Sequence, residues 1–563
     1  MCGIFGVIGT TEPKGVKNLR FWDRGPDQSG FESGGFGPLN FFLWHSRLNV
    51  SFGEGNRQPF LGILGSWFCF NGEIFNFDDL KNKFHPSAKT DTELLEFIVS
   101  KHLPSLPSIE GQYAFVRVNG KSRTVVLGRD RYGQKPLFYK QMRDQIVFGS
   151  VLQDVADYTG ASLKDKKFVF SKFHIGGERD TCFEGVLRVL PGQVLEIGFN
   201  SNRHEFIVLN DHRPPIVSFE ASDNEELDFR GELENSIDLC IKDLNNNFGI
   251  STSGGLDSSI LAIVEDEKAE GRNVDHFGSV FEDGFGFSER SNLETLGRHL
   301  KRPINLIEYT KNDFERQTVC FADLLRSLGQ PYPLFPGPQV LFYKEVRRKG
   351  VKVLLEGHGV DELYSTYNGA FKFGGNQSLL KLVLEEPRLA KVACGVLKNR
   401  IVSHWNSDPR VIQGKPVNMM MLTRCYQTIY GSLPKLLEIY DNLSAGCGVE
   451  VRNPYLNNDI SNFLLGQKII STKNMQSKPL FREFLNNVGL FQLAKGNKVG
   501  WQIGFWSQLN QKIYREMIFS SFRSKEIKDR LRKVYSEKNF TDYATQQRFL
   551  RDASYLAFAD VYG

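Results

Sequence analysis

The chain is long enough for several domains and has the composition of an ordinary globular protein. It has 563 residues, of which 24% are charged and 40% are hydrophobic, and this length predicts two to four domains. The formal net charge of +5, from 70 basic and 65 acidic residues, is too small to favour nucleic acid or a membrane as a partner. The sequence has no apolar run as long as a bilayer-spanning helix.

The cysteines and the first residues of the sequence indicate the cellular compartment. The eight cysteines are scattered and include no CxxC pair, so neither a disulfide framework nor a zinc site is predicted. The opening stretch MCGIFGVIGTTEPKG has no basic region and only a short apolar part, so we expect no signal peptide. A reducing, cytoplasmic location with small-molecule partners fits these features.

Cys2 is the first candidate for chemistry. If Met1 is removed, Cys2 carries a free α-amino group that titrates near about pH 8. That amine can take the proton of its own thiol and leave a reactive thiolate. A cysteine at the second position means little by itself, and chance would explain it. Cys69, in contrast, is interpreted as a buried core thiol.

Polar groups that could hold an amino acid stand at the ends of predicted strands and helices. They are Arg47 after a strand-like run at 41–44, Asn71, Gly72 and Glu73 after a run at 67–70, and Asp91 at the start of a helix-like segment that runs to Val99. Arg47 could pair with a carboxylate. Glu73 and Asp91 could accept hydrogen bonds from an α-ammonium, and Asn71 and Gly72 could donate to an oxyanion. Alone, Asn71-Gly72 would be read as a turn.

Seven blocks of sequence occur here in the order found in class II glutamine amidotransferases: MCGIFG, RGPDQSG, HSRLNV, NGEIFN, KTDTELL, EGQYAF and GRDRYGQKPLFY. More narrowly, they resemble the N-terminal glutaminase domain of asparagine synthetases. Over residues 1–205, the resemblance implies two stacked antiparallel sheets between helices, as in N-terminal-nucleophile hydrolases.

The same resemblance implies roles for individual residues. Cys2 would attack the side-chain amide of glutamine and release ammonia, with Asn71 and Gly72 as the oxyanion hole. Glutamine would be bound by the following residues: Arg47, Leu48, Asn49, Val50, Ser51, Asn71, Gly72, Glu73 and Asp91.

A change of composition marks the joint between domains. Residues 204–223 are rich in Pro, Asn, Asp and Ser, which favours a boundary there. An amphipathic helix is then predicted over 225–244. We expect the second domain over 224–520 and a helical tail without an assigned role over 521–563. Within that tail, the mixed charge run 523–538 is interpreted as a solvated helix face.

The stretch SGGLDSS at 253–259 stands between a strand-like run at 248–252 and a predicted helix. Gly254 and Gly255 would let the backbone present N–H groups to a phosphate at the start of that helix. Asp257 is unusual in an anion-binding loop unless it holds a metal ion, and Mg²⁺ fits that role. The loop lacks the Walker lysine. It resembles the pyrophosphate loop of enzymes that split ATP into AMP and pyrophosphate; the alternative is a turn that only caps a helix.

Beyond this loop, strand-like and helix-like segments alternate. The strands are expected at 276–281, 304–309 and 351–355, and the helices at 288–300 and 338–349. This alternation predicts an α/β domain, a parallel sheet covered by helices on both faces. The resemblance of the 253–259 loop to ATP-splitting enzymes implies a fold similar to that of the adenine nucleotide alpha hydrolases. Ligands are expected at the carboxyl ends of its strands.

The run EGHGVDE at 356–362 follows one predicted strand end and should face the same crevice. Asp361 is the natural second carboxylate for Mg²⁺, opposite Asp257. Blocks at 433–456 and 478–482 also resemble asparagine synthetases, and Lys478 matches a lysine thought to touch the phosphates. We expect ATP at the following residues: Ser251, Ser253, Gly254, Gly255, Asp257, Ser258, Ser259, Ser279, Glu356, Gly357 and Lys478.

His358 departs from the family pattern, which usually has glutamate at this position. A neutral imidazole can still accept a proton from ammonium or from a tetrahedral intermediate, so we expect His358 to be catalytic. One negative charge facing the acceptor is gone, which would suit a different or more anionic acceptor.

The sequence therefore predicts an ATP-dependent, glutamine-hydrolysing carbon–nitrogen ligase that forms an amide through an acyl-adenylate. Conversion of L-aspartate to L-asparagine is the first hypothesis, and a uronic acid of a surface polysaccharide or a peptide carboxylate is the alternative acceptor. A non-catalytic relative is a third hypothesis, against which Cys2, Asp257 and Asp361 speak together. A lactam-forming relative is disfavoured because such enzymes have generally lost the cysteine that Cys2 matches. The family also suggests a homodimer.

Overall fold

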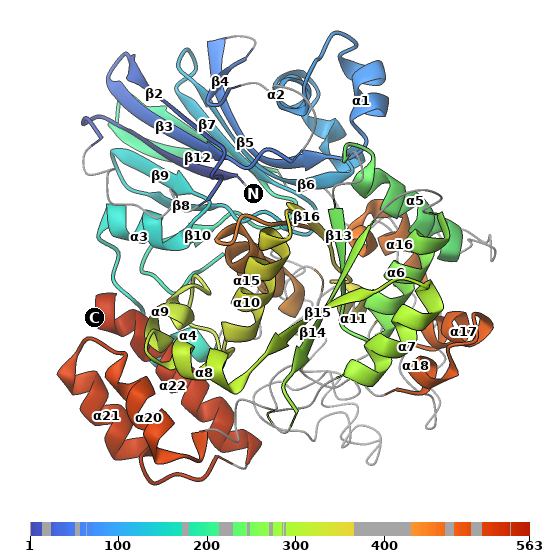
Figure 1. The fold of residues 1–563 in the computed structure, drawn as a ribbon. Helices are drawn as coiled ribbons and strands as arrows, with labels where there is room; N and C mark the ends of the chain where they lie inside the picture. The colour runs from blue at the N-terminus through green and yellow to red at the C-terminus, as the bar shows by residue number, and fades with distance from the viewer. Residues whose placement is uncertain are drawn as a thin grey trace, which may run out of the picture.

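The computed structural model describes residues 2–13, 24–50, 57–62, 65–171, 179–212, 229–244, 248–268, 274–283, 285, 289–364, 428, 431–467, 478–496, 509–540 and 542–562. These residues form two domains that lie one on the other (Figure 1). The antiparallel strands of the N-terminal half are at the top of the view, and the parallel sheet with most of the helices is below them.

The N-terminal domain contains two antiparallel sheets. Within the described residues, the first has the strand order β10 (Leu187–Arg188), β8 (Phe138–Gln141), β9 (Gln145–Gly149), β1 (Gly3–Gly9), β3 (Leu39–Arg47) and β2 (Gln28–Phe36). The second has the order β12 (Glu205–His212), β11 (Val194–Asn200), β7 (Thr124–Arg129), β6 (Gly111–Asn119), β5 (Ser66–Ile74) and β4 (Phe60–Leu61). Side chains alternate along each strand. In β1, Ile4 and Ile8 therefore enter the core between the sheets, while Phe5 and Val7 enter a second cluster on the outer face.

Helices cover the outer faces of both sheets. The first sheet is covered by α3 (Leu152–Thr159) and α4 (Lys166–Ser171), and the second by α1 (Phe77–Phe84), α2 (Asp91–Lys101) and a 3-10 helix (Leu103–Ser108). This layering confirms the predicted two-sheet fold between helices. Cys69 is fully buried in the core between the sheets, as a core thiol should be.

The C-terminal domain is built on a parallel sheet. Its strand order among the described residues is β15 (Ile304–Tyr309), β14 (Asp275–Phe281), β13 (Phe248–Thr252), β16 (Val353–Leu355) and β17 (Glu450–Arg452). Every pairing between these strands is parallel. Because β13 and β16 are neighbours, the loops that follow them at 253–255 and 356–359 meet at one edge of the sheet.

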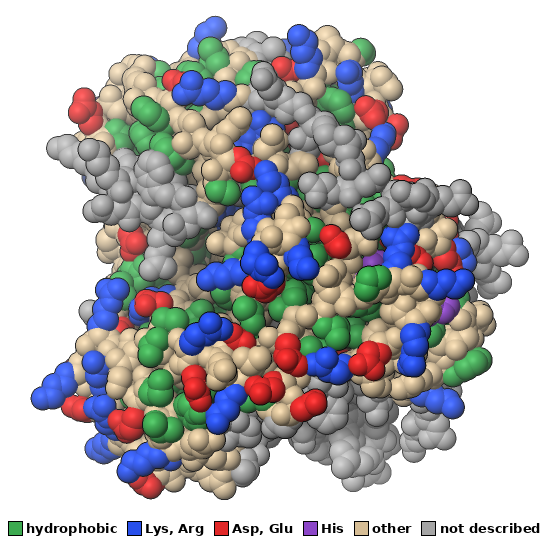
Figure 2. Space-filling model, viewed as in Figure 1, with side chains coloured by type: hydrophobic (Ala, Val, Ile, Leu, Met, Phe, Trp, Pro, Cys, Tyr) green, Lys and Arg blue, Asp and Glu red, His purple; other side chains and the backbone are tan. Residues whose placement is uncertain are grey.

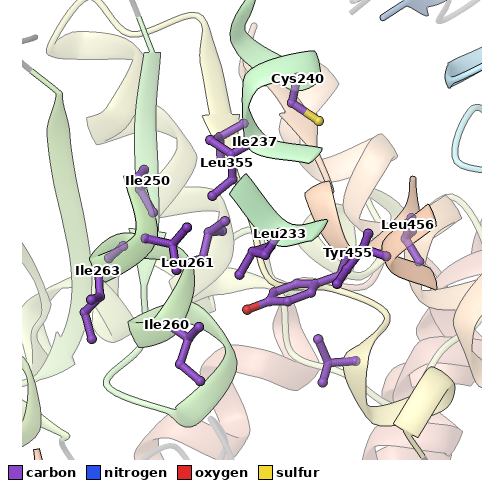
Figure 3. Close-up of a cluster of buried hydrophobic side chains, with 14 of the residues drawn as sticks. Leu233, Ile237, Cys240, Ile250, Ile260, Leu261, Ile263, Leu355, Tyr455 and Leu456 are labelled. Atoms are coloured by element: carbon purple, nitrogen blue, oxygen red, sulfur yellow. The ribbon is translucent and has the colours of Figure 1, made fainter. Parts of the chain in front are cut away.

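Both faces of this sheet are covered by helices, as predicted. One face packs on α5 (Phe229–Ile241), α6 (Leu256–Lys268), α7 (Arg290–Leu300), α11 (Val360–Tyr364), α16 (Asn458–Gly466), α17 (Pro479–Asn487) and α18 (Phe491–Lys495). The other packs on α8 (Lys311–Thr318), α9 (Phe321–Arg326), α10 (Gly337–Arg348), α15 (Ser432–Ala445), α20 (Lys512–Ser520), α21 (Lys525–Tyr535) and α22 (Tyr543–Tyr562). Figure 3 shows the first of these cores, where Ile250 of β13 and Leu355 of β16 meet apolar residues of α5 and α6.

The surface carries both signs of charge, and the described helices lack the features of membrane spans. Basic and acidic side chains are interspersed over the face seen in Figure 2. Among the residues that the structure describes, none of the helices has the length and apolar character that a membrane span requires.

The last helices are integrated into both domains. On α21, Ile527, Leu531 and Tyr535 are buried, so the charged run at 523–538 has an apolar inner side. Helix α22 contributes residues such as Phe549 to the core of the C-terminal domain. Its Phe558 is fully buried in the outer cluster of the first N-terminal sheet. Helix α22 therefore packs against both domains.

This placement predicts a large effect of truncating Phe558. Phe558→Ala should lower the free energy of unfolding by about 3–5 kcal/mol, because it removes a fully buried ring at a domain junction. Val561→Ala is the matched control on the same helix, since Val561 is 42% exposed, and it should change stability by less than about 0.5 kcal/mol. Urea unfolding of the three proteins measures both values. Equal stability of the two variants would contradict the junction role of α22.

Candidate functional site

Cys2 immediately precedes β1, where the N-terminal domain meets the C-terminal domain. It is partly buried, and its backbone oxygen accepts a hydrogen bond from Arg24 Nε at 2.9 Å. Burial raises the pKa of the Cys2 thiol, while the α-ammonium of the chain and a backbone hydrogen bond from Leu48 oppose that rise. With a raised pKa, the thiol needs a nearby base to become a nucleophile at neutral pH.

Asn71 and Gly72 are neighbours on β5. Asn71 is fully buried, and neither atom of its side-chain amide has a hydrogen-bond partner among the described residues. A buried polar group without a partner costs about 1–3 kcal/mol, so it commonly marks a place where a ligand completes the hydrogen bonding. Gly72 has φ 144°, and a Cβ there would lie 1.9 Å from the backbone oxygen of Gln112. Only glycine fits at this position.

Glu73 and Asp91 are partly buried acids that lie close enough to interact electrostatically. Helix α2 begins at Asp91 because the Thr90 side chain caps it by accepting a hydrogen bond from the Glu93 N–H at 3.2 Å. Burial raises the pKa of Asp91 to about 6, and Arg47 opposes the rise. Burial and then the charge of Asp91 raise the pKa of Glu73 well above its usual range. A cationic group bound between the two acids would favour their ionised forms.

The predicted glutamine-binding segment at 47–51 follows β3. Leu48 is buried, and Val50 packs against the hydrophobic core of the C-terminal domain. Arg47 Nη2 donates to Asn49 Oδ1 at 3.4 Å. Ser51 lies outside the described residues. The described part of the segment therefore borders both domains.

Contacts from Asp27 and Lys352 hold this segment in place. The Asn49 N–H donates to Asp27 Oδ2 at 2.8 Å. Lys352, just before β16, donates through Nζ to the same Asp27 oxygen at 2.8 Å and to the Asn49 backbone oxygen at 3.1 Å. Asp27 stands in the RGPDQSG block, so its sequence context could have suggested a role. Lys352 stands in no motif, and only the fold identifies it.

The loop at 253–255 connects β13 to α6, as the sequence predicts. The Ser253 N–H donates to Ser258 Oγ at 3.0 Å, and the Gly255 N–H donates to Ser253 Oγ at 3.3 Å. Gly254 has φ 79°, in the region that favours glycine. Ser259 is fully buried, and its Oγ has no hydrogen-bond partner among the described residues. The loop is thus shaped by its own serines at the N-terminus of a helix, where an anion is stabilised.

The neighbouring strands bring other predicted ATP-binding residues to the same edge. Ser251 in β13 and Ser279 in β14 are both partly exposed. Gly357, after β16, lies against the loop, because a Cβ there would be 3.3 Å from the Asp257 Cβ and 3.3 Å from the Ser258 backbone nitrogen. This edge is the carboxyl end of the strands, where α/β sheets bind ligands.

Asp257 and Asp361 converge on one cation, the ammonium group of Lys478. Lys478 Nζ lies 2.5 Å from Asp257 Oδ2 and 2.7 Å from Asp361 Oδ1. The described residues contain no group of three or more His, Cys, Asp and Glu side chains placed to hold a metal. Two converging carboxylates suit Mg²⁺, which commonly takes its other ligands from water and substrate phosphates. The residues present therefore fit the ion, with the ammonium as its stand-in.

His358 has a carboxylate partner that the sequence does not reveal. His358 Nε2 lies 2.6 Å from Glu356 Oε2, and Tyr343 donates through its hydroxyl to Glu356 Oε1 at 3.0 Å. The ring of Tyr440 packs on the imidazole with centroids 4.6 Å apart. A carboxyl group therefore lies two residues before position 358 and contacts the imidazole that stands in place of the usual glutamate.

Buried ion pairs join the two domains. Asp441 on α15 accepts from Arg24 Nη2 at 2.7 Å and lies 3.5 Å from Lys135 Nζ. One turn earlier, Glu438 forms a bidentate ion pair with Arg188. Arg188 Nε donates to Glu438 Oε2 at 2.7 Å, and Arg188 Nη2 donates to Glu438 Oε1 at 3.1 Å. Burial alone would raise the pKa of Glu438, but Arg188 holds it below its usual range. These residues pair across hundreds of positions in the chain, so the sequence could not predict their contacts.

Comparison with protein families matches residues 1–206 to a glutamine amidotransferase domain and residues 228–553 to asparagine synthase. The chain belongs to the asparagine synthase family. The predicted relationship to glutamine-hydrolysing asparagine synthetases is confirmed.

Individual relatives are distant. The chain is 25% identical over 413 residues to asparagine synthetase 2 of Bacillus subtilis, an alignment that covers 67% of this chain and 54% of that protein. It is 26% identical over 394 residues to asparagine synthetase 1 of the same organism, covering 65% and 59%. It is also 26% identical over 374 residues to the amidase chyE of Penicillium rubens, covering 61% and 53%. The chain thus spans little more than half the length of these relatives.

The convergence on Lys478 predicts how the site responds to divalent ions. Lys478→Met should leave the carboxylates of Asp257 and Asp361 facing each other, so that Mg²⁺ binds and stabilises the variant by about 1.4 kcal/mol at ten times its dissociation constant. Thermal unfolding with and without MgCl₂ measures this. Lys352→Met is the control, since Lys352 pairs with one carboxylate only, and Mg²⁺ should not raise its melting temperature. No response of Lys478→Met would count against a metal site here.

Proposed function

We propose that this protein is an ATP-dependent, glutamine-hydrolysing amidotransferase that converts a carboxylate into an amide through an acyl-adenylate. One observation carries the proposal. A single chain of the asparagine synthase family holds two separate sets of groups, one around Cys2 and one around the loop at 253–255, and buried ion pairs on α15 join the domains between them.

The first half-reaction is proposed at Cys2. After removal of Met1, the α-amine takes the thiol proton, and the sulfur attacks the side-chain amide carbon of glutamine. Asn71 and Gly72 donate to the oxyanion, a contribution of about 3 kcal/mol per donor in such sites. Ammonia leaves, and water then hydrolyses the thioester to glutamate. The α-ammonium of the substrate is assigned to Glu73 and Asp91, and its carboxylate to Arg47.

The second half-reaction is proposed at the edge of the parallel sheet. The backbone N–H groups of the 253–255 loop and the ammonium of Lys478 bind the phosphates of ATP. Asp257 and Asp361 would hold Mg²⁺, which when bound supplies positive charge to the leaving pyrophosphate. The acceptor carboxylate attacks the α-phosphorus, and pyrophosphate leaves. Ammonia then attacks the acyl carbon, His358 accepts a proton, and AMP departs.

L-Aspartate is proposed as the acceptor, because the asparagine synthetases are the relatives that the chain matches over the greatest length among those compared above. Another carboxylate, such as a uronic acid or a peptide carboxylate, is the second candidate. It is favoured by His358 in place of the usual glutamate and by a relative of similar identity that is named an amidase.

The direct test incubates the purified chain with ATP, MgCl₂ and glutamine, with and without L-aspartate, and measures AMP, pyrophosphate and asparagine. We expect AMP release that depends on aspartate and equals asparagine formed. Cys2→Ala is the matched control, which should lose the glutamine-dependent reaction but retain synthesis from ammonium chloride. Glutamine hydrolysis without aspartate-dependent AMP would exclude aspartate and direct the search to sugar acids. Absence of both glutamine hydrolysis and AMP release would overturn the proposal.

A further inference from the structure

His358 is held on several sides by groups that a lone proton acceptor would not need. Its Nε2 contacts Glu356 Oε2 at 2.6 Å, and Glu356 in turn accepts a hydrogen bond from the Tyr343 hydroxyl at 3.0 Å. The Tyr440 ring packs against the imidazole in a tilted arrangement, with an interplanar angle of 49°. Glu356 in the loop after β16 and Tyr440 on α15 contact the ring directly, and Tyr343 on α10 contacts it through Glu356.

The exposure of the three side chains decreases from His358 to Glu356 to Tyr343. The side chain of His358 is 24% exposed and that of Glu356 is 8% exposed, while Tyr343 is 1% exposed. Of the three, the imidazole is the group that solvent and substrates reach most easily. Glu356 and Tyr343 lie behind it, like the orienting groups of a catalytic histidine.

The hydrogen bonds also decide which ring nitrogen carries the proton. A carboxylate can only accept, so Glu356 Oε2 requires a proton on His358 Nε2. Burial raises the pKa of Tyr343 well above its usual range, so its hydroxyl remains a donor and satisfies the second oxygen of Glu356. In a neutral ring with Nε2 protonated, Nδ1 has the lone pair.

We propose that Glu356 and Tyr343 are positioning residues that make His358 Nδ1 the proton acceptor for amide formation, and that Glu356 does not bind ATP. This inference rests on the proposed function and assigns Glu356 a different role from the one that the family resemblance suggests. Tyr440 completes the arrangement by fixing the plane of the ring.

The step that the three residues would serve is the attack of ammonia on the acyl-adenylate. The nitrogen lone pair forms the new C–N bond, and Nδ1 takes a proton from that nitrogen. The bond between the acyl carbon and the phosphate oxygen then breaks, and AMP leaves with the electron pair. The imidazolium that forms is stabilised by the Glu356 carboxylate in a partly buried place, where such a pair is stronger than in water. The proton later passes to solvent.

A double-mutant cycle tests the assignment on ammonia-dependent synthesis with MgATP, using L-aspartate or, if aspartate is inactive, D-galacturonate. Glu356→Gln and His358→Gln should each lower kcat by roughly 10²- to 10⁴-fold, with the KM for ATP changed by less than about twofold. The double variant should fall no further than His358→Gln, because Glu356 acts through His358. A raised KM for ATP together with multiplying losses would overturn the inference and make Glu356 an ATP ligand.

Two further variants distinguish a loss of His358 orientation from a general loss of structure. Tyr343→Phe should lower kcat by about tenfold, because one hydrogen bond to Glu356 is lost. Tyr514→Phe makes the same chemical change at another tyrosine bonded to a glutamate, Glu315, and should leave kcat unchanged. Glutamine hydrolysis at Cys2 should survive in every variant and reports on folding.

A spectroscopic readout keeps the inference testable even if the proposed function fails, which would show as a wild type that releases no AMP with any acceptor. Long-range ¹H–¹⁵N correlation of ¹⁵N-histidine protein, with the His358 signals assigned by their loss in His358→Gln, reports the tautomer. At about pH 8.5, where an ordinary histidine is neutral, we expect protonated Nε2 and unprotonated Nδ1 in the wild type, and a changed pattern in Glu356→Gln. The opposite tautomer in the wild type would overturn the inference by itself.

Discussion

The arrangement of both candidate sites depends on buried ion pairs along one face of α15. Glu438 pairs with Arg188, and Asp441 pairs with Arg24 and Lys135. Breaking a buried pair by removing one partner typically costs about 3–5 kcal/mol, because an uncompensated charge is left in a place of low dielectric. Such pairs hold only when their geometry is satisfied. They therefore fix how the N-terminal domain sits on the C-terminal domain.

Helix α15 also contacts the surroundings of both candidate sites through two consecutive residues. Tyr440 packs on His358, and the next residue, Asp441, binds Arg24, which donates to the backbone oxygen of Cys2. Two consecutive residues thus touch the surroundings of both sites. Glu450 on β17 adds to this junction. Burial opposes its ionisation, but Arg452, Lys135 and the α-ammonium of the chain hold its pKa below the usual range. Glu450 of the C-terminal domain is thus stabilised by Lys135 of the N-terminal domain as well as by Arg452.

Much of the fold and many site positions could be predicted because they are encoded locally. Apolar runs predict the strands at 304–309 and 248–252, and the glycines after the second run predict the loop at 253–255. The structure has these elements as expected. The contact between Glu356 and His358 was not predicted, although the residues are close in sequence. Which polar group a side chain turns to is decided by packing, here by Tyr343 and Tyr440, and no local pattern contains that information.

The role of the last residues was unpredictable for a similar reason. The sequence of α22 shows a helix but not what covers it, and Phe558 reaches a cluster formed mainly by residues of the first two hundred positions. Long-range burial of this kind becomes visible only when the whole chain is folded.

The central proposal is that Cys2 and the second site act as one amidotransferase, in which the amide nitrogen of glutamine becomes the nitrogen of the amide product. The most direct measurement supplies amide-¹⁵N glutamine in the presence of excess unlabelled ammonium chloride and determines the ¹⁵N content of the amide product by mass spectrometry. The account predicts a product labelled well above the isotope ratio of the free ammonium. A product whose label equals that of the bulk ammonium would contradict it.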